Sequence, residues 1–360
     1  MTVDLDLLPG GGTLRAEVRA YLEPRHDPMR LADLVSGSPG YDPDVWADLG
    51  RKGWLTLGTP QATVAELAVL ASELGRARVP TPFQNGVVQP SWAGVPAGTR
   101  RVAFCLPGPA GRVTPGALGV TCHRAGAGVR LHGVKRYVPY ADTAELLVVV
   151  ADGPGAGVSL VAVPVPADGV TVETAPSIAG DRQAEVRFDD VHADGDAVIG
   201  TLGEAAERVR LAVLVGTVSL CAEAVGASAA LVERTTAHAL TRVQFGGPIG
   251  RLQAVQHRLA DMAMDHLAAV GAVDDAVACL DAGRPADVEI AAAKALCGTA
   301  CLRVAASAHQ IWGGTGYLAD AGLHHWTRLI KGIDAQLGGA REQRRELARL
   351  LAAGGGWSTH

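Results

Sequence analysis

The sequence predicts a mainly α-helical protein with a β-domain in its middle, and two observations predict this fold. Apolar residues recur at three- and four-residue spacing in residues 13–85 and again in residues 201–352, as on the buried face of a helix. Between them, residues 100–200 carry short runs, most of them rich in valine and separated by Gly, Pro or Asp. Short strands with turn signals about 8–12 residues apart indicate an antiparallel barrel or sandwich.

The N-terminal part is expected to form a helical domain over residues 1–99. Helical patterns cover residues 14–22, 45–52 and 64–76. The last pattern ends before residues 79–82, which read Val-Pro-Thr-Pro, because proline cannot continue a helix.

The middle part, residues 100–200, is expected to form the β-barrel domain. Seven runs fit strands, at residues 101–106, 118–122, 129–132, 144–150, 158–165, 170–173 and 184–188. The C-terminal part, residues 201–360, is expected to form a four-helix bundle. Its predicted helices cover residues 205–240, 252–282, 285–311 and 323–351. The first would be roughly 54 Å long at 1.5 Å per residue, and helices of this length need partner helices.

Composition limits the classes of function. Of the 360 residues, 48% are hydrophobic and 19% are charged, which favours a large core, and the net charge is −5. There is no Lys/Arg run for nucleic acid, no leader of basic then apolar residues, and no charge-free window of about 20 apolar residues. We therefore expect a cytoplasmic protein that binds neither nucleic acid nor a membrane. Scattered cysteines without a CxxC pair predict reduced thiols and no metal site; they are Cys105, Cys122, Cys221, Cys279, Cys297 and Cys301.

Two motifs follow the ends of predicted bundle helices. Residues 242–250 read Arg-Val-Gln-Phe-Gly-Gly-Pro-Ile-Gly, and residues 310–317 read Gln-Ile-Trp-Gly-Gly-Thr-Gly-Tyr. Together with Lys294 on the helix before the second motif, they resemble the acyl-CoA dehydrogenase family, and the resemblance extends over nearly the whole chain. It implies a helical domain, a β-barrel and a four-helix bundle. It also implies FAD as cofactor, an acyl-CoA thioester as substrate, and an electron-transfer flavoprotein or a similar acceptor.

The residue types in these motifs suit a cofactor that carries a pyrophosphate. Arg242 supplies a cation with bidentate geometry, and Gly313 and Gly314 allow close backbone approach. The amides of Gln253 and Gln310 are further ligands. The resemblance assigns two more residues to the FAD site, Gln244 and Phe245. Taken singly, each feature has a plainer reading: a helix-ending glycine turn, a solvated arginine or a core phenylalanine.

The resemblance also bears on assembly. It implies that the arginine–phenylalanine motif and the glycine turn reach one FAD from different subunits, and hence at least a dimer, usually a tetramer.

The sequence departs from the family where the chemistry needs a base. The reaction removes an α-proton from the thioester, so a carboxylate with a raised pKa is required. An ungapped count places the usual base position at Leu337 and the alternative one at Gly216, and neither side chain accepts a proton. Weak candidates are Asp320, Asp334 and Glu207, against the plainer reading of solvated surface charge.

The middle domain departs as well. Residues 105–112 read Cys-Leu-Pro-Gly-Pro-Ala-Gly-Arg, without the hydroxyl and acidic groups that the family places there. This pattern resembles bacterial steroid-degrading dehydrogenases built from two unequal chains, one of which holds the base. We therefore expect the base-lacking subunit of a heteromeric enzyme. A homomeric flavoenzyme with altered chemistry in secondary metabolism, or a non-catalytic structural paralogue, remains an alternative.

Overall fold

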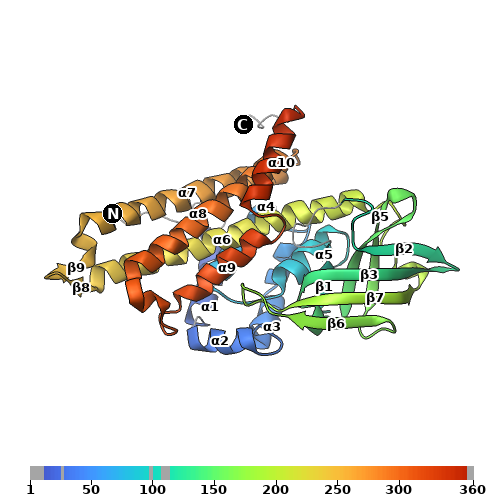
Figure 1. The fold of residues 1–360 in the computed structure, drawn as a ribbon, viewed down its shortest axis with the longest axis horizontal. Helices are drawn as coiled ribbons and strands as arrows, with labels where there is room; N and C mark the ends of the chain where they lie inside the picture. Colours follow the sequence, from blue (N-terminus) through green and yellow to red (C-terminus); the bar gives the residue numbers. More distant parts are fainter. Residues whose placement is uncertain (1–11, 26–27, 97–99, 107–113, 355–360) are drawn as a thin grey trace.

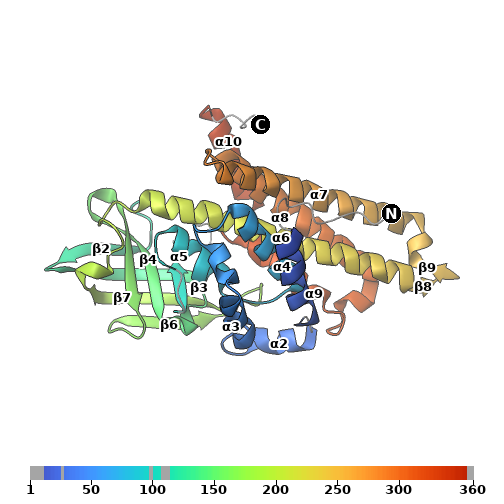
Figure 2. The same cartoon turned by 180° about the vertical axis from the view of Figure 1, so that it is seen from behind.

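The computed structural model describes residues 12–25, 28–96, 100–106 and 114–354. N-terminal helices, a central sheet and C-terminal helices follow one another along the chain, which confirms the predicted fold class (Figure 1). The helix α6 (Ala206–Thr241) runs from the sheet to the opposite end of the molecule (Figures 1 and 2). Most of the other long helices pack against it, so α6 connects the two ends.

The N-terminal part of the chain is helical. Its helices are α1 (Gly12–Leu22), α2 (Pro28–Ser36), α3 (Pro43–Arg51), α4 (Val64–Ala77) and α5 (Gln89–Trp92). Of these, α2 and α3 lie along the lower edge of the view in Figure 1. The short α2 and a π-helical segment at Gln84–Val88 lie outside the predicted helical patterns. The helices α4 and α6 cross in close contact: a Cβ on Gly226 would lie 1.8 Å from the carbonyl oxygen of Ser72.

The middle domain is one curled seven-stranded sheet. Its strands are β1 (Val102–Cys105), β2 (Val120–Ala125), β3 (Gly128–Pro139), β4 (Leu146–Asp152), β5 (Val158–Pro164), β6 (Val170–Ala175) and β7 (Gln183–Ala193). The order is β1-β4-β2-β3-β7-β6, with β5 also paired to β4. The prediction of seven strands is confirmed, but the purely antiparallel pattern is wrong, because β4 pairs in parallel with β1 and β2.

The C-terminal helices form a bundle around α6. They are α7 (Gln253–Asp281), α8 (Asp287–Trp312), α9 (Leu323–Ala335) and α10 (Ala340–Ala352), and a small hairpin of β8 (Val243–Gln244) and β9 (Gly247–Pro248) joins α6 to α7. The prediction of one continuous helix over residues 323–351 is wrong. Leu337 and Gly338 have φ of +54° and +89°, which no α-helix accommodates. Asp334 Oδ1 then accepts from the N–H of Ala340 at 3.0 Å and starts α10.

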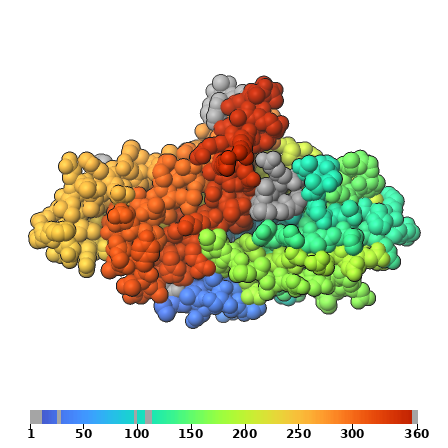
Figure 3. All heavy atoms as spheres, in the orientation of Figure 1, coloured from blue at the N-terminus to red at the C-terminus, as the bar shows by residue number. Residues whose placement is uncertain are grey.

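The predicted domain boundaries at residues 99/100 and 200/201 remain a prediction. One hydrophobic core includes Ala68 and Ala71 of α4 together with residues of α6, α7, α8 and α9. Figure 3 shows α10 rising out of the body of the molecule, and no residue of α10 is buried.

Among the described residues, two helices are long and apolar enough, by length and composition alone, to cross a membrane. They are Ala206–Thr241 and the stretch Asp287–Tyr317, which joins α8 to the turn after it. In their most apolar windows, 78% and 61% of the residues are buried inside the protein. Core helices of a bundle have the same character, so this is weak evidence for a membrane span.

Candidate functional site

The first motif forms a tight hairpin at the end of α6. Phe245 and Gly246 both have positive φ, 54° and 82°, as in a type I′ turn. The Nη2 of Arg251 donates to the carbonyl oxygen of Phe245 at 2.5 Å and braces the turn. The hairpin therefore holds the Phe245 ring outside the protein, where it is 82% exposed. Arg242, which caps α6, and Gln244 are exposed as well.

The second motif ends α8 in a glycine turn, the 3₁₀ segment η8 (Gly313–Tyr317). Gly313 has φ of +60°, and a Cβ on Gly313 or Gly314 would meet nothing within 4 Å. Both glycines and Gln310 are exposed. The turn therefore leaves open backbone that a ligand can approach closely.

The two motifs lie together at one end of the chain (Figures 1 and 2). His238, one helical turn before Arg242, stacks on Trp312 with ring centroids 4.0 Å apart and planes 12° apart. Gln253 begins α7 directly after the hairpin and is exposed. One chain thus brings Arg242 and Gly313 to the same place. The expectation that two subunits contribute these motifs to one FAD remains a prediction.

Large apolar side chains are exposed at this same end. They are Leu240, Val243, Phe245, Tyr317 and Leu318, each more than half exposed. A concentration of exposed apolar groups marks an interaction surface. The end formed by the hairpin and η8, which we call the tip, therefore suits contact with another molecule.

The two expected base positions lie far from the tip, beside one cavity of about 480 Å³. Leu337 lines this cavity and is buried. Thr217, next to Gly216 on α6, also lines it, and a Cβ on Gly216 would lie 3.0 Å from the Gln89 side chain. Both expected base positions thus lie near the same cavity. Neither Leu337 nor Gly216 offers a carboxylate there.

Three acids line this cavity, Asp287, Glu342 and Glu346, and each is already engaged. Arg210 bridges Glu207 and Asp287, each at 2.8 Å. The hydrogen bond from Arg210 lowers the pKa of Glu207 below its ordinary value, the opposite of what a general base needs. Glu342 accepts from the N–H of Gly339 at 3.2 Å, and Arg349 pairs with Glu346 at 2.5 Å.

The other weak candidates are placed elsewhere. Asp334 caps α10 through the N–H of Ala340, and it lines no part of the cavity. Asp320 lies exposed in the turn after η8. Of the stretch 105–112 in the middle domain, the structure describes Cys105 and Leu106, and residues 107–112 lie outside the described residues.

Sequence reasoning missed Glu223. It lies on the α6 face of Gly216, seven residues further along, and lines a small pocket of about 50 Å³ with Arg78, Gln84 and Asp181. Burial raises the pKa of Glu223 to about 7, although Arg78 and Gln84 act in the opposite direction. The available signal was a lone acid in the long apolar run of α6. Seven residues rise about 10 Å along a helix, so Glu223 does not reach the position of Gly216.

The tip and the cavity are well separated along the same helices. On α8, Ala291 lines the cavity and Trp312 borders the tip, and 21 residues rise about 32 Å. A single FAD whose pyrophosphate lies at the tip cannot also place its ring in this cavity.

Comparison with known proteins identifies relatives of this chain. The family model for the C-terminal domain of acyl-CoA dehydrogenases matches residues 208–351. The chain is 29% identical over 380 residues to the acyl-CoA dehydrogenase FadE27 of Mycobacterium tuberculosis, covering 95% of this chain and 96% of the relative. It is 31% identical to the probable acyl-CoA dehydrogenase YngJ of Bacillus subtilis, but that match covers only 61% of this chain and 60% of the relative.

Solved structures agree with this assignment. The ChsE4–ChsE5 complex from Mycobacterium tuberculosis contains a chain with 25% identity and a TM-score of 0.86, covering 98% of both chains. A steroid acyl-CoA dehydrogenase, the Tcur3481–Tcur3483 G363A variant, has 27% identity and a TM-score of 0.84, covering 96% of this chain and 99% of that chain.

Proposed function

Because this chain belongs to the acyl-CoA dehydrogenase family of FAD-dependent oxidoreductases, we propose that it is the base-lacking subunit of a heteromeric acyl-CoA dehydrogenase. The proposed reaction is α,β-dehydrogenation of a CoA thioester. One observation carries the proposal: the exposed arginine and glycine turn at the tip lie about 32 Å from a cavity without an available base. A homologous subunit would then supply the base, while the tip of this chain would bind the phosphate portion of the FAD.

The tip residues fit the phosphate portion of FAD. Arg242 offers an exposed guanidinium for a pyrophosphate, and Gly313 and Gly314 leave open space and free backbone beside it. Gln253 and Gln310 add amide donors, and the Phe245 ring offers a flat apolar face. When bound, FAD accepts the hydride that leaves the β-carbon of the thioester.

The cavity beside Leu337 explains why a second subunit is needed. Removal of the α-proton requires a carboxylate within hydrogen-bond reach of the substrate, and such a base contributes about 10²–10⁴-fold. Leu337 and Gly216 supply none, and the acids lining this cavity are held by Arg210, Arg349 and a helix cap. The cavity of this chain would therefore hold no proton acceptor for a thioester.

The proposed partners follow from the surface and the relatives. The exposed apolar side chains of the tip and the unburied α10 suit a homologous acyl-CoA dehydrogenase subunit, in a dimer or a heterotetramer. The similar ChsE4–ChsE5 and Tcur3481–Tcur3483 structures are each named after two chains, and the second is a steroid acyl-CoA dehydrogenase. This supports a steroid-derived acyl group as the substrate of the proposed enzyme. We further propose a cytoplasmic location and an electron-transfer flavoprotein, or a similar protein, as acceptor.

A second candidate function rests on Glu223. In a homomeric flavoenzyme with altered chemistry, this carboxyl would be the proton acceptor, because its pKa of about 7 suits a general base. Its pocket of about 50 Å³ and its distance of about 10 Å along α6 from Gly216 argue for a substrate placed differently from that of the family.

The flavin content of the purified protein tests the proposal. The chain is purified alone and together with a homologous subunit that carries an intact base, and the flavin absorption of each is recorded. We expect little flavin on the chain alone and about one FAD per pair of unlike chains. Full flavin occupancy of the chain alone would instead support the homomeric alternative.

A further inference from the structure

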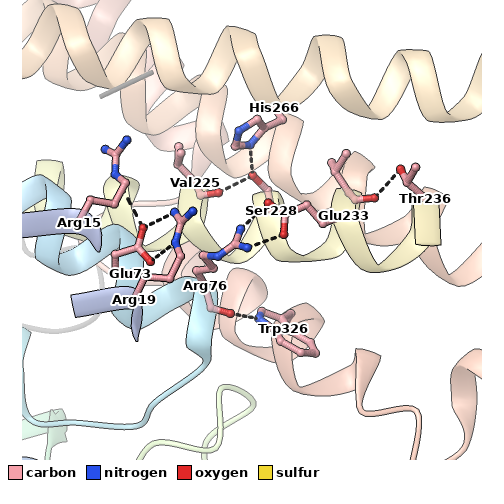
Figure 4. Close-up of polar contacts among 11 residues, drawn as sticks. Arg15, Arg19, Glu73, Arg76, Val225, Ser228, Glu233, Thr236, His266 and Trp326 are labelled. Carbon is pink, nitrogen blue, oxygen red and sulfur yellow. Dashed lines mark hydrogen bonds and ion pairs between the residues drawn. The ribbon is translucent and has the colours of Figure 1, made fainter. Parts of the chain in front are cut away.

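A cluster of charged side chains lies where α1, α4, α6 and α9 meet (Figure 4). It surrounds a cavity of about 250 Å³ that shares no lining residue with the cavity beside Leu337. Apolar side chains form part of its wall, among them Leu22 and Ala230. The cavity is too small for a CoA thioester but large enough for a small organic molecule.

Three acids line the cavity: Glu23, Glu73 and Glu233. Glu23 is exposed to solvent, and the other two are paired with arginines. Arg19 binds Glu73 through two hydrogen bonds of 2.6 and 2.9 Å, and Arg76 binds Glu233 through two of 2.5 Å (Figure 4). Such fork-to-fork pairs use both oxygens of each carboxylate. Glu73 also lies 3.8 Å from Arg15, so arginines other than Arg234 engage both of these carboxylates.

Arg234 is the third arginine that lines the cavity. Its guanidinium carbon lies 4.8 Å from the ring centroid of Trp326, and its buried Nε has no hydrogen-bond partner among the described residues. Burial lowers the pKa of Arg234, and no neighbouring carboxylate opposes the effect. A desolvated guanidinium with an unmet donor is costly unless an anion completes it.

The wall beneath Arg234 is rigid. Trp326 is 1% exposed, and its indole N–H donates to the carbonyl oxygen of Arg76 at 3.0 Å (Figure 4). The indole plane is thus fixed by packing and by this bond. It supports Arg234 from one side, and both side chains line the cavity.

We propose that this cavity binds the carboxylate of a small organic acid, with Arg234 as the cationic ligand and Trp326 as the flat wall. The planar guanidinium fork matches the two oxygens of a carboxylate. The apolar wall at Leu22 and Ala230 suits a short hydrocarbon body. This site is independent of the proposed dehydrogenase reaction, since it needs neither a thioester nor FAD.

Benzoate and butyrate are the probes. Added to the purified full-length chain at constant ionic strength, each should raise the melting temperature in a saturable way, because a ligand of the folded state stabilises it. Arg234→Gln should weaken the apparent affinity at least about tenfold, the loss expected for a charge-assisted contact. Arg303→Gln is the matched control, since Arg303 pairs with Asp265 on the bundle surface, and it should change nothing.

Two further arms make the result decisive. Arg234→Lys keeps the positive charge but lacks the planar guanidinium, so it should bind benzoate with intermediate affinity. This variant keeps the test valid if Arg234→Gln does not fold. Neutral benzamide should not stabilise the protein, and inorganic phosphate should bind more weakly than benzoate. Equal stabilisation by phosphate, or benzoate affinity that persists in Arg234→Gln, would overturn the proposal.

Discussion

The rings of His238 and Trp312 stack with their centroids 4.0 Å apart, and this contact joins the end of α6 to the end of α8. Arg242 follows His238 by one helical turn, and Gly313 directly follows Trp312. The stack therefore fixes the cation and the open glycine backbone relative to each other. It makes the tip a single preorganised surface rather than two separate motifs.

Arg242→Ala should weaken FAD binding in the complex with the homologous subunit by about 1.5–3 kcal/mol, the scale of a lost charge-assisted hydrogen bond. The measurement is the flavin that stays bound during dilution and gel filtration. Arg187→Ala is the control, because Arg187 is an exposed arginine on β7 that pairs with Glu185. Equal flavin retention by the two variants would remove Arg242 from the cofactor site.

His238→Phe should make flavin retention less sensitive to acid. Burial and the neighbouring Arg242 lower the pKa of His238 below its ordinary value of 6.5, so the stabilising stack contains a neutral ring at pH 7. Because the folded pKa is the lower one, this stability is lost as pH falls through it. The wild-type complex should release flavin more readily than the variant between pH 7 and pH 5. Parallel release curves would contradict the role of the stack.

Glu223→Gln should stabilise the protein at high pH and have little effect at low pH. Burial raises the pKa of Glu223 from 4.5 to about 7, in a pocket that it shares with Arg78, Gln84, Asp181 and Tyr140. A raised folded pKa contributes stability that is complete below pH 4.5 and is lost as pH rises through about 7. The variant should therefore gain on the order of 2 kcal/mol over the wild type at pH 8. Chemical denaturation at pH 5 and pH 8 measures the difference, and a pH-independent difference would refute it.

Lys294→Met should destabilise the bundle. The buried ammonium of Lys294 donates to the carbonyl oxygens of Ile333 and Asp334 at 2.5 and 3.2 Å, at the end of α9. Leaving buried carbonyl groups without a donor costs about 1–3 kcal/mol. Lys331→Met, on an exposed position of α9, should change stability by less than about 0.5 kcal/mol. Similar urea midpoints for the two variants would show that Lys294 does not hold this turn.

The long elements could be predicted from the sequence because their periodicity is local. The helix expected over residues 205–240 is α6, Ala206–Thr241, and that expected over residues 252–282 is α7, Gln253–Asp281. The break at Leu337 was missed, although the pair Gly338-Gly339 directly after it is a helix-ending signal. The parallel pairing of β1 with β4 depends on contacts about 40 residues apart, which no local pattern encodes.

The residues of the tip motifs could be identified from the sequence, but their common position in the fold could not. Gln310, Gly313 and Arg242 stood out by residue type, yet only the packing of α6 against α8 puts them side by side. Glu223 is the reverse case. Its chemistry depends on burial among residues from four separate segments of the chain, so its raised pKa exists only in the folded protein.

The most direct test of the proposed role is turnover by the chain with and without its partner. The purified chain is assayed with short, branched and steroid CoA thioesters, FAD and an artificial electron acceptor, then assayed again after assembly with a base-bearing homologous subunit. We expect little or no turnover by the chain alone and at least about 10²-fold more in the complex, since a general base contributes that much. Robust turnover by the chain alone, abolished by Glu223→Gln, would contradict the base-lacking role and place the base at Glu223.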